Sequence, residues 1–165
     1  MLEAHNRSRF ETVGYSVGLQ QKSDLRRRVR QSFDTFRDLI NMADRNVAQT
    51  IADDNLDVLV DLMGHTRSMR LGVLRYRPAP VTAHFLGYPG TIGTNVIDYA
   101  IADSLVVPRD SEPNFSEAIA RLPDTYQPND NKRPLAMASR TREMYGLKSD
   151  AFVLGATPPD LCAAG

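Results

Sequence analysis

Short apolar runs alternate with longer amphipathic stretches along the chain, and this alternation predicts its secondary structure. Residues 9–18 (RFETVGYSVG) have the pattern of a strand, and residues 2–8 before them resemble the end of a helix. Residues 24–52 carry apolar side chains mostly at helical spacing, which predicts helix. A break at residues 41–44 divides this stretch into two predicted helices.

The middle of the chain predicts a parallel sheet. Residues 56–62 (LDVLVDL) are nearly continuous in apolar side chains, which is typical of a strand buried on both faces of such a sheet. Residues 71–77 predict a short helix that ends before Pro78, because the residue preceding a proline disfavours helix. Strands that alternate with helices indicate right-handed crossovers and a doubly wound α/β layer. Three further strands are predicted at residues 81–87 (VTAHFLG), 97–103 (IDYAIAD) and 118–123 (AIARLP).

A polar, aperiodic segment at residues 124–140 predicts a linker between two domains. Residues 1–123 are expected to form most of one α/β lobe that lacks its start. Residues 141–165 are expected to begin a second lobe, with a strand at residues 152–154, and to be cut short.

Composition and charge exclude several classes of function. Lys and Arg together number 20, as do Asp and Glu, so no net field favours nucleic acid or an anionic membrane. The basic run at residues 25–30 (LRRRVR) is either a small anion-binding patch or, as we favour, a solvated helix face. Cys162 is the single cysteine and cannot by itself form an internal disulfide or a zinc site. Without a signal peptide or a long apolar stretch, the sequence predicts a cytoplasmic protein.

A glycine-rich segment directly follows the strand predicted at residues 81–87. We call residues 86–93 (LGYPGTIG) the glycine loop. In open α/β sheets ligands bind beyond the carboxyl ends of strands, and glycines let the backbone approach them closely. The spacing is not that of a dinucleotide fingerprint, and no Gly-Lys-Ser/Thr of a Walker loop is present. These features alone favour a structural turn over a ligand loop, and leave both open.

Four segments together resemble one enzyme family. They are LDVLVDLMGHTRSMR (56–70), RPAPVTAHFLGYPGTIG (77–93), IDYAIAD (97–103) and LPDTYQPND (122–130). They are similar to the catalytic region of protein O-linked N-acetylglucosamine transferases, including the bacterial SPINDLY-like proteins of glycosyltransferase family forty-one. The resemblance covers nearly all of residues 1–130 and, more loosely, residues 139–155. It implies a fragment of that region: a Rossmann-like parallel-sheet lobe of a GT-B enzyme, truncated at both ends.

The resemblance also implies an activity. Members of the family transfer N-acetylglucosamine from UDP-GlcNAc to Ser or Thr of acceptor proteins without a metal ion or other cofactor. Their catalytic region usually follows tetratricopeptide repeats. A related O-fucosyltransferase using GDP-fucose, a noncatalytic remnant and a protein-interaction module are the alternatives. The family's His-Pro motif and the lysine and His-Thr-Thr segment of its second lobe are not found in the 165 residues. We therefore expect the chain alone to be inactive.

The resemblance assigns donor binding to Leu86, Gly87 and Pro89, with Gly87 facing the cleft against the sugar nucleotide.

Arg70 matches a family arginine near the acceptor side of the cleft, and His65 and Arg67 hold neighbouring positions. No residue is assigned a certain catalytic role; Arg70 and His65 are the candidates, and no metal site is expected. His65 and Asp61 have a structural alternative, which is hydrogen bonding of the turn after the strand. Tyr88 either stacks on a ligand or shields the glycine backbone. Three further polar residues are assigned to packing or turns: His84, Asp98 and Asp103.

Overall fold

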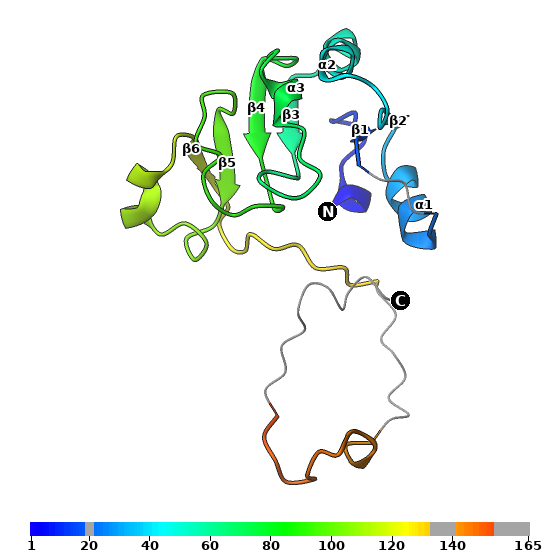
Figure 1. Ribbon diagram of the computed structural model, residues 1–165, viewed down its shortest axis with the longest axis vertical. Helices are drawn as coiled ribbons and strands as arrows, with labels where there is room; N and C mark the ends of the chain where they lie inside the picture. The colour runs from blue at the N-terminus through cyan, green and yellow to red at the C-terminus, as the bar shows by residue number, and fades with distance from the viewer. Residues whose placement is uncertain (19–21, 133–140, 154–165) are drawn as a thin grey trace. The chain divides into compact units, whose positions relative to one another are not determined.

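The computed structural model describes residues 1–18, 22–132 and 141–153 (Figure 1). The chain divides into two compact units, residues 1–129 and 130–165. The division falls inside the predicted linker, of which residues 133–140 lie outside the described residues. That the two units correspond to two catalytic lobes stays a prediction.

The second unit contains a short 3-10 helix, η3 (Glu143–Tyr145). A strand was predicted at residues 152–154, but Phe152 and Val153 belong to no strand, and Leu154 lies outside the described residues, as does Cys162.

The first unit is built on parallel strands, which confirms the predicted α/β class. Strands β1 and β2 form a two-stranded sheet, and β3, β4, β5 and β6 form a four-stranded sheet in that order. Every strand pair is parallel. The strands are β1 (Val13–Ser16), β2 (Thr35–Asp38), β3 (Val58–Asp61), β4 (Val81–His84), β5 (Tyr99–Ala102) and β6 (Ala118–Arg121). The helices are η1 (Leu2–Ala4), α1 (Asp24–Gln31), α2 (Asp44–Asp53), α3 (Leu71–Leu74) and η2 (Arg109–Asn114).

The prediction of two helices across residues 24–52 is wrong in its centre, where β2 stands. Phe33 and Phe36 have helical spacing, but both rings pack against Gly14 of β1, where a Cβ atom would lie 2.8 Å and 2.7 Å from their nearest carbons. Ahead of β2, the Thr12 amide donates to the Asp34 carboxylate at 2.8 Å, and the Asp34 amide donates to the Thr12 carbonyl at 3.0 Å. Pairing with β1 therefore overrides the local pattern. The second predicted helix is α2, which begins at Asp44, but the first ends at Gln31, well before the predicted break at residues 41–44.

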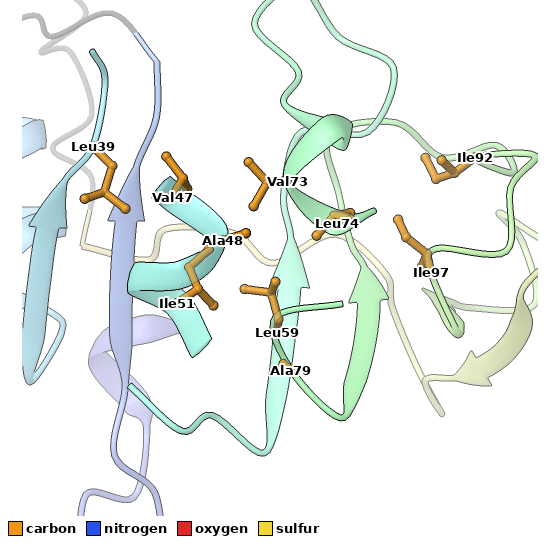
Figure 2. Packing of buried hydrophobic residues seen from close by; sticks show 10 residues of the cluster. All are labelled: Leu39, Val47, Ala48, Ile51, Leu59, Val73, Leu74, Ala79, Ile92 and Ile97. Atoms are coloured by element: carbon orange, nitrogen blue, oxygen red, sulfur yellow. The ribbon is translucent and has the colours of Figure 1, made fainter. Parts of the chain in front are cut away.

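Helices α2 and α3 pack against one face of the four-stranded sheet at β3, and their buried side chains contribute to the main core (Figure 2). Leu59 of β3 contributes the inward side chain of the first strand, and Val47 of α2 is fully buried. The segment after β4 also enters this core through Ile92 and Ile97. The core consists of Leu39, Val47, Ala48, Ile51, Leu59, Val73, Leu74, Ala79, Ile92 and Ile97.

The opposite face of β3 is open within the described residues, contrary to the prediction that residues 56–62 are buried on both faces. Val58 and Val60 are 51% and 39% exposed, whereas Leu59 between them is 9% exposed. The register aligns Val60 with Ala83 and Ala83 with Tyr99, so these side chains share the open face. Val60 and Tyr99 are 39% and 43% exposed, whereas Ala83 between them is 4% exposed, so the open part of this face is confined to β3 and to Tyr99.

Candidate functional site

The two loops that follow β3 and β4 lie against each other at the carboxyl ends of these strands. Asp61 and His84 are register partners, so β3 and β4 end at the same level. The Phe85 amide donates to the Asp61 carbonyl at 2.9 Å, which extends the pairing into the loops. The glycine loop then turns back over the sheet face that carries Leu59, where Ile92 joins the core.

Gly87 is required by the packing of the two loops. A Cβ atom at this position would lie 2.2 Å from the Leu62 carbonyl oxygen and 2.8 Å from that of Met63. A side chain at Gly87 would point at the backbone of Leu62 and Met63 and not into an open cleft. The expectation that this position faces a cleft is therefore wrong for the side-chain direction. The other surface of Gly87 is exposed. The left-handed residues of the loop are Leu86 (φ 71°) and Gly93 (φ 73°), not Gly87.

Tyr88 fills the space between the loops. A Cβ atom at Gly64 would lie 2.6 Å from Tyr88 Cβ, and one at Gly90 would lie 2.9 Å from the Tyr88 ring. The ring also meets His65 edge-on, with centroids 5.3 Å apart. Tyr88 thus shields the glycine backbone, and the 37% of its surface that stays exposed is open to a ligand. Pro89, at the tip of the loop, is exposed.

Side chains from three other segments fix the backbone of the glycine loop. His65 Nε2 lies 2.9 Å from the Ile92 carbonyl oxygen and donates to it. The Ile92 amide donates to Glu117 Oε1 at 2.7 Å. The Tyr126 hydroxyl donates to the Leu86 carbonyl at 2.7 Å. His65 thus has a structural role, but its partner is the glycine loop and not the turn after β3 that the sequence suggested. Glu117 and Tyr126 were missed, because no local pattern marks them.

Glu117 is buried and forms no ion pair at contact distance within the described residues. Its residue is 5% exposed. Burial alone would raise the pKa of the Glu117 carboxyl, but hydrogen bonds from the Thr91 hydroxyl and the Ile92 amide outweigh it and lower the pKa. The carboxylate is therefore the stable form, and it acts as a hydrogen-bond acceptor.

His84 lies at the end of β4 in the same electrostatic environment. Burial lowers the pKa of its imidazole, and the nearby carboxylates of Glu117 and Asp61 oppose this only in part. Its Nε2 is buried and has no hydrogen-bond partner within the described residues. A neutral, packed histidine fits this position, as the sequence predicted.

Arg70 holds α2 and α3 together in this structure. Its guanidinium donates to Asp44 Oδ1 at 2.8 Å through Nε and to the Met42 carbonyl at 2.7 Å. A Cβ atom at Gly72 would lie 2.1 Å from Asp44 Oδ2, so the glycine leaves room for this ion pair. Arg67 is exposed and has no ion-pair partner in the described part of the chain. A catalytic role for Arg70 or His65 stays a prediction.

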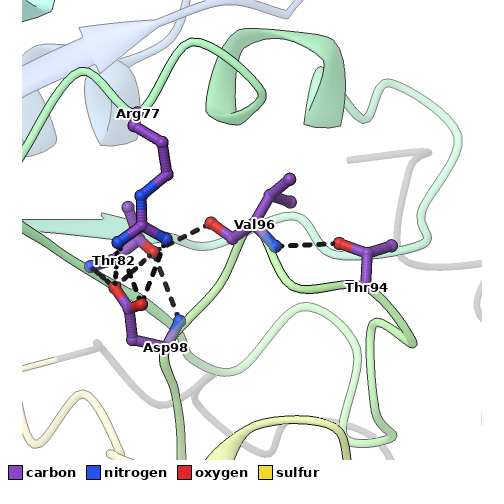
Figure 3. Close-up of polar contacts among 5 residues, drawn as sticks. All are labelled: Arg77, Thr82, Thr94, Val96 and Asp98. Carbon is purple, nitrogen blue, oxygen red and sulfur yellow. Dashed lines mark hydrogen bonds and ion pairs between the residues drawn. The ribbon is translucent and has the colours of Figure 1, made fainter.

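Three aspartates at strand ends have structural roles. Asp61 accepts hydrogen bonds from the Met63 and Gly64 amides at 3.3 and 2.7 Å, which caps the turn after β3. Asp98 accepts from the Thr82 amide and hydroxyl at 2.8 and 2.9 Å and pairs with Arg77 at 3.0 Å (Figure 3). The carboxylate of Asp103 accepts from the amides of Leu105, Val106 and Tyr126.

The basic run at residues 25–30 is neutralised by neighbouring carboxylates. Its four arginines all have acidic partners, and three of them, Arg26, Arg27 and Arg30, also border a surface pocket together with Lys22, Ser23 and Asp24. A solvated, ion-paired helix face therefore describes this run. The pairs are Arg26–Asp38, Arg27–Asp24, Arg28–Glu3 and Arg30–Asp38.

Two absences hold for the described residues only. No group of His, Cys, Asp and Glu side chains in residues 1–18, 22–132 and 141–153 is arranged to hold a metal ion. Of the helices in those ranges, none has the length and apolar character needed to cross a membrane.

Comparison with known proteins relates the chain to protein glycosyltransferases. The family described as glycosyl transferase family 41 matches residues 1–151. The chain is 31% identical, over 154 residues, to a probable UDP-N-acetylglucosamine–peptide N-acetylglucosaminyltransferase SEC of Arabidopsis thaliana, which covers 90% of this chain. It is 33% identical over 128 residues, 76% of the chain, to the corresponding SPINDLY protein of the same plant. A Caenorhabditis elegans UDP-N-acetylglucosamine–peptide N-acetylglucosaminyltransferase is 30% identical over 79% of the chain.

A solved structure supports the same relationship. A mutant of the Thermobaculum terrenum O-GlcNAc transferase superposes with a TM-score of 0.72 at 32% identity, over 76% of this chain and 24% of that one. This likeness confirms the predicted Rossmann-like lobe of the GT-B type. The matched region spans only 16% of the SEC protein, 14% of SPINDLY and 12% of the nematode enzyme.

Proposed function

The chain belongs to glycosyl transferase family 41, and from this premise we propose that it forms part of the N-terminal catalytic lobe of a protein O-GlcNAc transferase. The observation that carries the proposal is the family match across residues 1–151, which includes the whole glycine loop. In the proposed reaction the hydroxyl oxygen of an acceptor Ser or Thr bonds to the anomeric carbon of N-acetylglucosamine. The bond to the diphosphate breaks, UDP leaves, and the hydroxyl proton passes to solvent.

We assign donor binding to the exposed surface of the glycine loop, at Leu86, Gly87 and Pro89. The Gly87 amide already donates to the Phe85 carbonyl at 3.0 Å. The amides of Tyr88 and Gly90 make no hydrogen bond within the described residues, so they are free to donate to oxygen atoms of the nucleotide sugar. Fixed backbone donors of this kind stabilise charge that develops on a leaving group without having to reorganise.

The rest of the proposal follows the family. The acceptor is a protein, the donor is UDP-GlcNAc, and transfer needs no metal ion or other cofactor. The protein is proposed to work in the cytoplasm and, in its complete form, to carry tetratricopeptide repeats. Neither nucleic acid nor a membrane is proposed as a partner.

The test uses the full-length product of the reading frame that contains residues 1–165. Transfer of labelled N-acetylglucosamine to an acceptor protein is measured with EDTA present, with GDP-fucose as the competing donor. We expect Pro89→Ala to weaken UDP-GlcNAc binding, because the proline stiffens the tip of the loop. Pro80→Ala is the matched control, since Pro80 is also exposed but precedes β4 at the other end of the strand. Transfer of fucose alone, or neither binding nor transfer, would refute the proposal.

A further inference from the structure

Glu117 connects the glycine loop to the start of β6 through both of its carboxylate oxygens. The Thr91 hydroxyl donates to Oε2 at 2.7 Å and the Ile92 amide donates to Oε1 at 2.7 Å. Both partners are loop residues 25 or 26 positions earlier in the chain. Hydrogen bonds to an ionised acceptor are about twice as strong as those between neutral groups. The carboxylate therefore fixes the second half of the loop.

A second set of contacts depends on this anchor. Thr91 Oγ1 also accepts from the Gly93 and Ser116 amides, at 3.0 and 3.2 Å. On the other side of the same peptide segment, the Ile92 carbonyl accepts from His65. The backbone of Ile92 is thus held at both of its polar groups, the amide by Glu117 and the carbonyl by His65.

Glu117 is not itself placed to touch a ligand. It is 5% exposed, and its two oxygens are occupied by the loop. A buried carboxylate carries a desolvation cost, and the hydrogen bonds from Thr91 and Ile92 are the largest contributions that offset it. That cost argues for a specific local task, and the group it holds is the loop to which donor binding is assigned.

We propose that Glu117 is a positioning residue that sets the affinity for the nucleotide sugar by fixing the glycine loop. The inference rests on the proposed function, because the ligand of the loop comes from it. Glutamine is the conservative replacement: its carbonyl oxygen can accept from the Ile92 amide while its amide donates to Thr91 Oγ1. Alanine removes both bonds.

The experiment compares four variants of the full-length protein with wild type: Glu117→Ala, Glu117→Gln, Thr91→Val and Thr91→Ser. We expect Glu117→Ala to raise the Kd for UDP-GlcNAc by about tenfold or more, the loss that about 1.4 kcal/mol would give. We expect Glu117→Gln and Thr91→Ser to stay within about threefold of wild type. Thr91→Val, which keeps the Ile92 bond, should lie between them and serves as the probe if Glu117→Ala fails to fold.

Two controls separate positioning from general damage. Glu112→Ala removes a carboxylate that pairs with Arg121 away from the glycine loop, and should leave the Kd unchanged. Hydrogen exchange of the Ile92 amide in the 165-residue chain should accelerate in Glu117→Ala and not in Glu112→Ala.

The outcomes are distinct. If wild type binds UDP-GlcNAc and Glu117→Ala binds it equally well, the inference is overturned and the proposed function stands. If Ile92 exchange is unchanged in Glu117→Ala, the inference is likewise overturned, whatever the ligand. If wild type does not bind UDP-GlcNAc, the proposed function fails, and the assignment of Glu117 to donor affinity fails with it.

Discussion

Replacing Gly87 with alanine tests whether the glycine loop is wedged against the loop after β3. The added methyl group would lie 2.2 Å from one backbone oxygen and 2.8 Å from another, and ordinary contacts begin at 3.4 Å. Neither oxygen belongs to a side chain that could rotate away. The two loops must therefore separate, which breaks the contacts between Gly64 and Tyr88 and the hydrogen bond from His65 to Ile92.

The magnitude follows from these losses. Overpacking of a well-packed site costs about 1–3 kcal/mol. Loss of the His65 hydrogen bond adds about 0.5–1.5 kcal/mol. We expect Gly87→Ala to lower the free energy of unfolding by about 2–4 kcal/mol, and the melting temperature by about 4–16 °C for a chain of this size.

Thermal and urea unfolding of the 165-residue chain, followed by circular dichroism, measure this effect. Gly18→Ala is the matched control, because the nearest atom to a Cβ there is 4.0 Å away and the backbone is not left-handed. That variant should stay within about 1 kcal/mol of wild type. Gly93→Ala, with φ 73° and open space, isolates the cost of a left-handed backbone, about 1 kcal/mol. If Gly87→Ala unfolds like Gly18→Ala, the packing argument is refuted.

Three further predictions concern the sheet and its ends. In urea unfolding, Leu59→Ala should lower the free energy of unfolding by about 2–4 kcal/mol. Val60→Ala should lower it by less than about 1 kcal/mol, because Val60 faces the open side of β3. Equal losses would mean that this side is covered. Because burial lowers the pKa of His84, the unfolded state binds the extra proton, and stability should fall as pH drops below about 6.5. His84→Leu should flatten the profile below about pH 6.5, and an unchanged profile would contradict this. Asp98→Ala should lower the free energy of unfolding by about 1–3 kcal/mol, because it leaves the Thr82 amide and hydroxyl unpaired. The control, Asp124→Ala at an exposed position, should show no measurable loss. Equal melting temperatures of the two variants would argue against the Asp98 network.

The sequence predicted the strands that have a local apolar pattern. Strands β1, β3, β4, β5 and β6 fall within the predicted ranges, because each has a local apolar pattern. Strand β2 was missed, because Thr35–Asp38 has no such pattern and becomes a strand through contacts with β1 about 22 residues earlier. The open sheet face was also missed. A run of branched apolar residues indicates that a strand can be buried on both faces, but not whether another segment is present to cover it.

For the candidate site, the sequence predicted the position of the glycine loop but not what holds it. Its place after β4 follows from local pattern and from the rule for parallel sheets. Its supports come from far along the chain: Glu117 acts over 25 residues and Tyr126 over 40. A glutamate before a short strand and a tyrosine in a polar segment have no local signal that distinguishes them from solvated residues. Only the folded chain shows these contacts.

A structural turn and a ligand loop, which the sequence treated as alternatives, are compatible, because they concern different surfaces of the same residues. The side of the loop that meets Leu62, Met63 and the core explains why Gly87 cannot carry a side chain. The other side exposes Gly87, Tyr88 and Pro89. A loop that binds a ligand through its backbone must hold that backbone still, since any ordering on binding would reduce affinity. The packing that makes Gly87 structurally necessary therefore also provides the rigid surface that the proposed donor binding requires. Gly87→Ala should consequently lose stability and UDP-GlcNAc affinity together, whereas Pro89→Ala should lose affinity with little change in melting temperature.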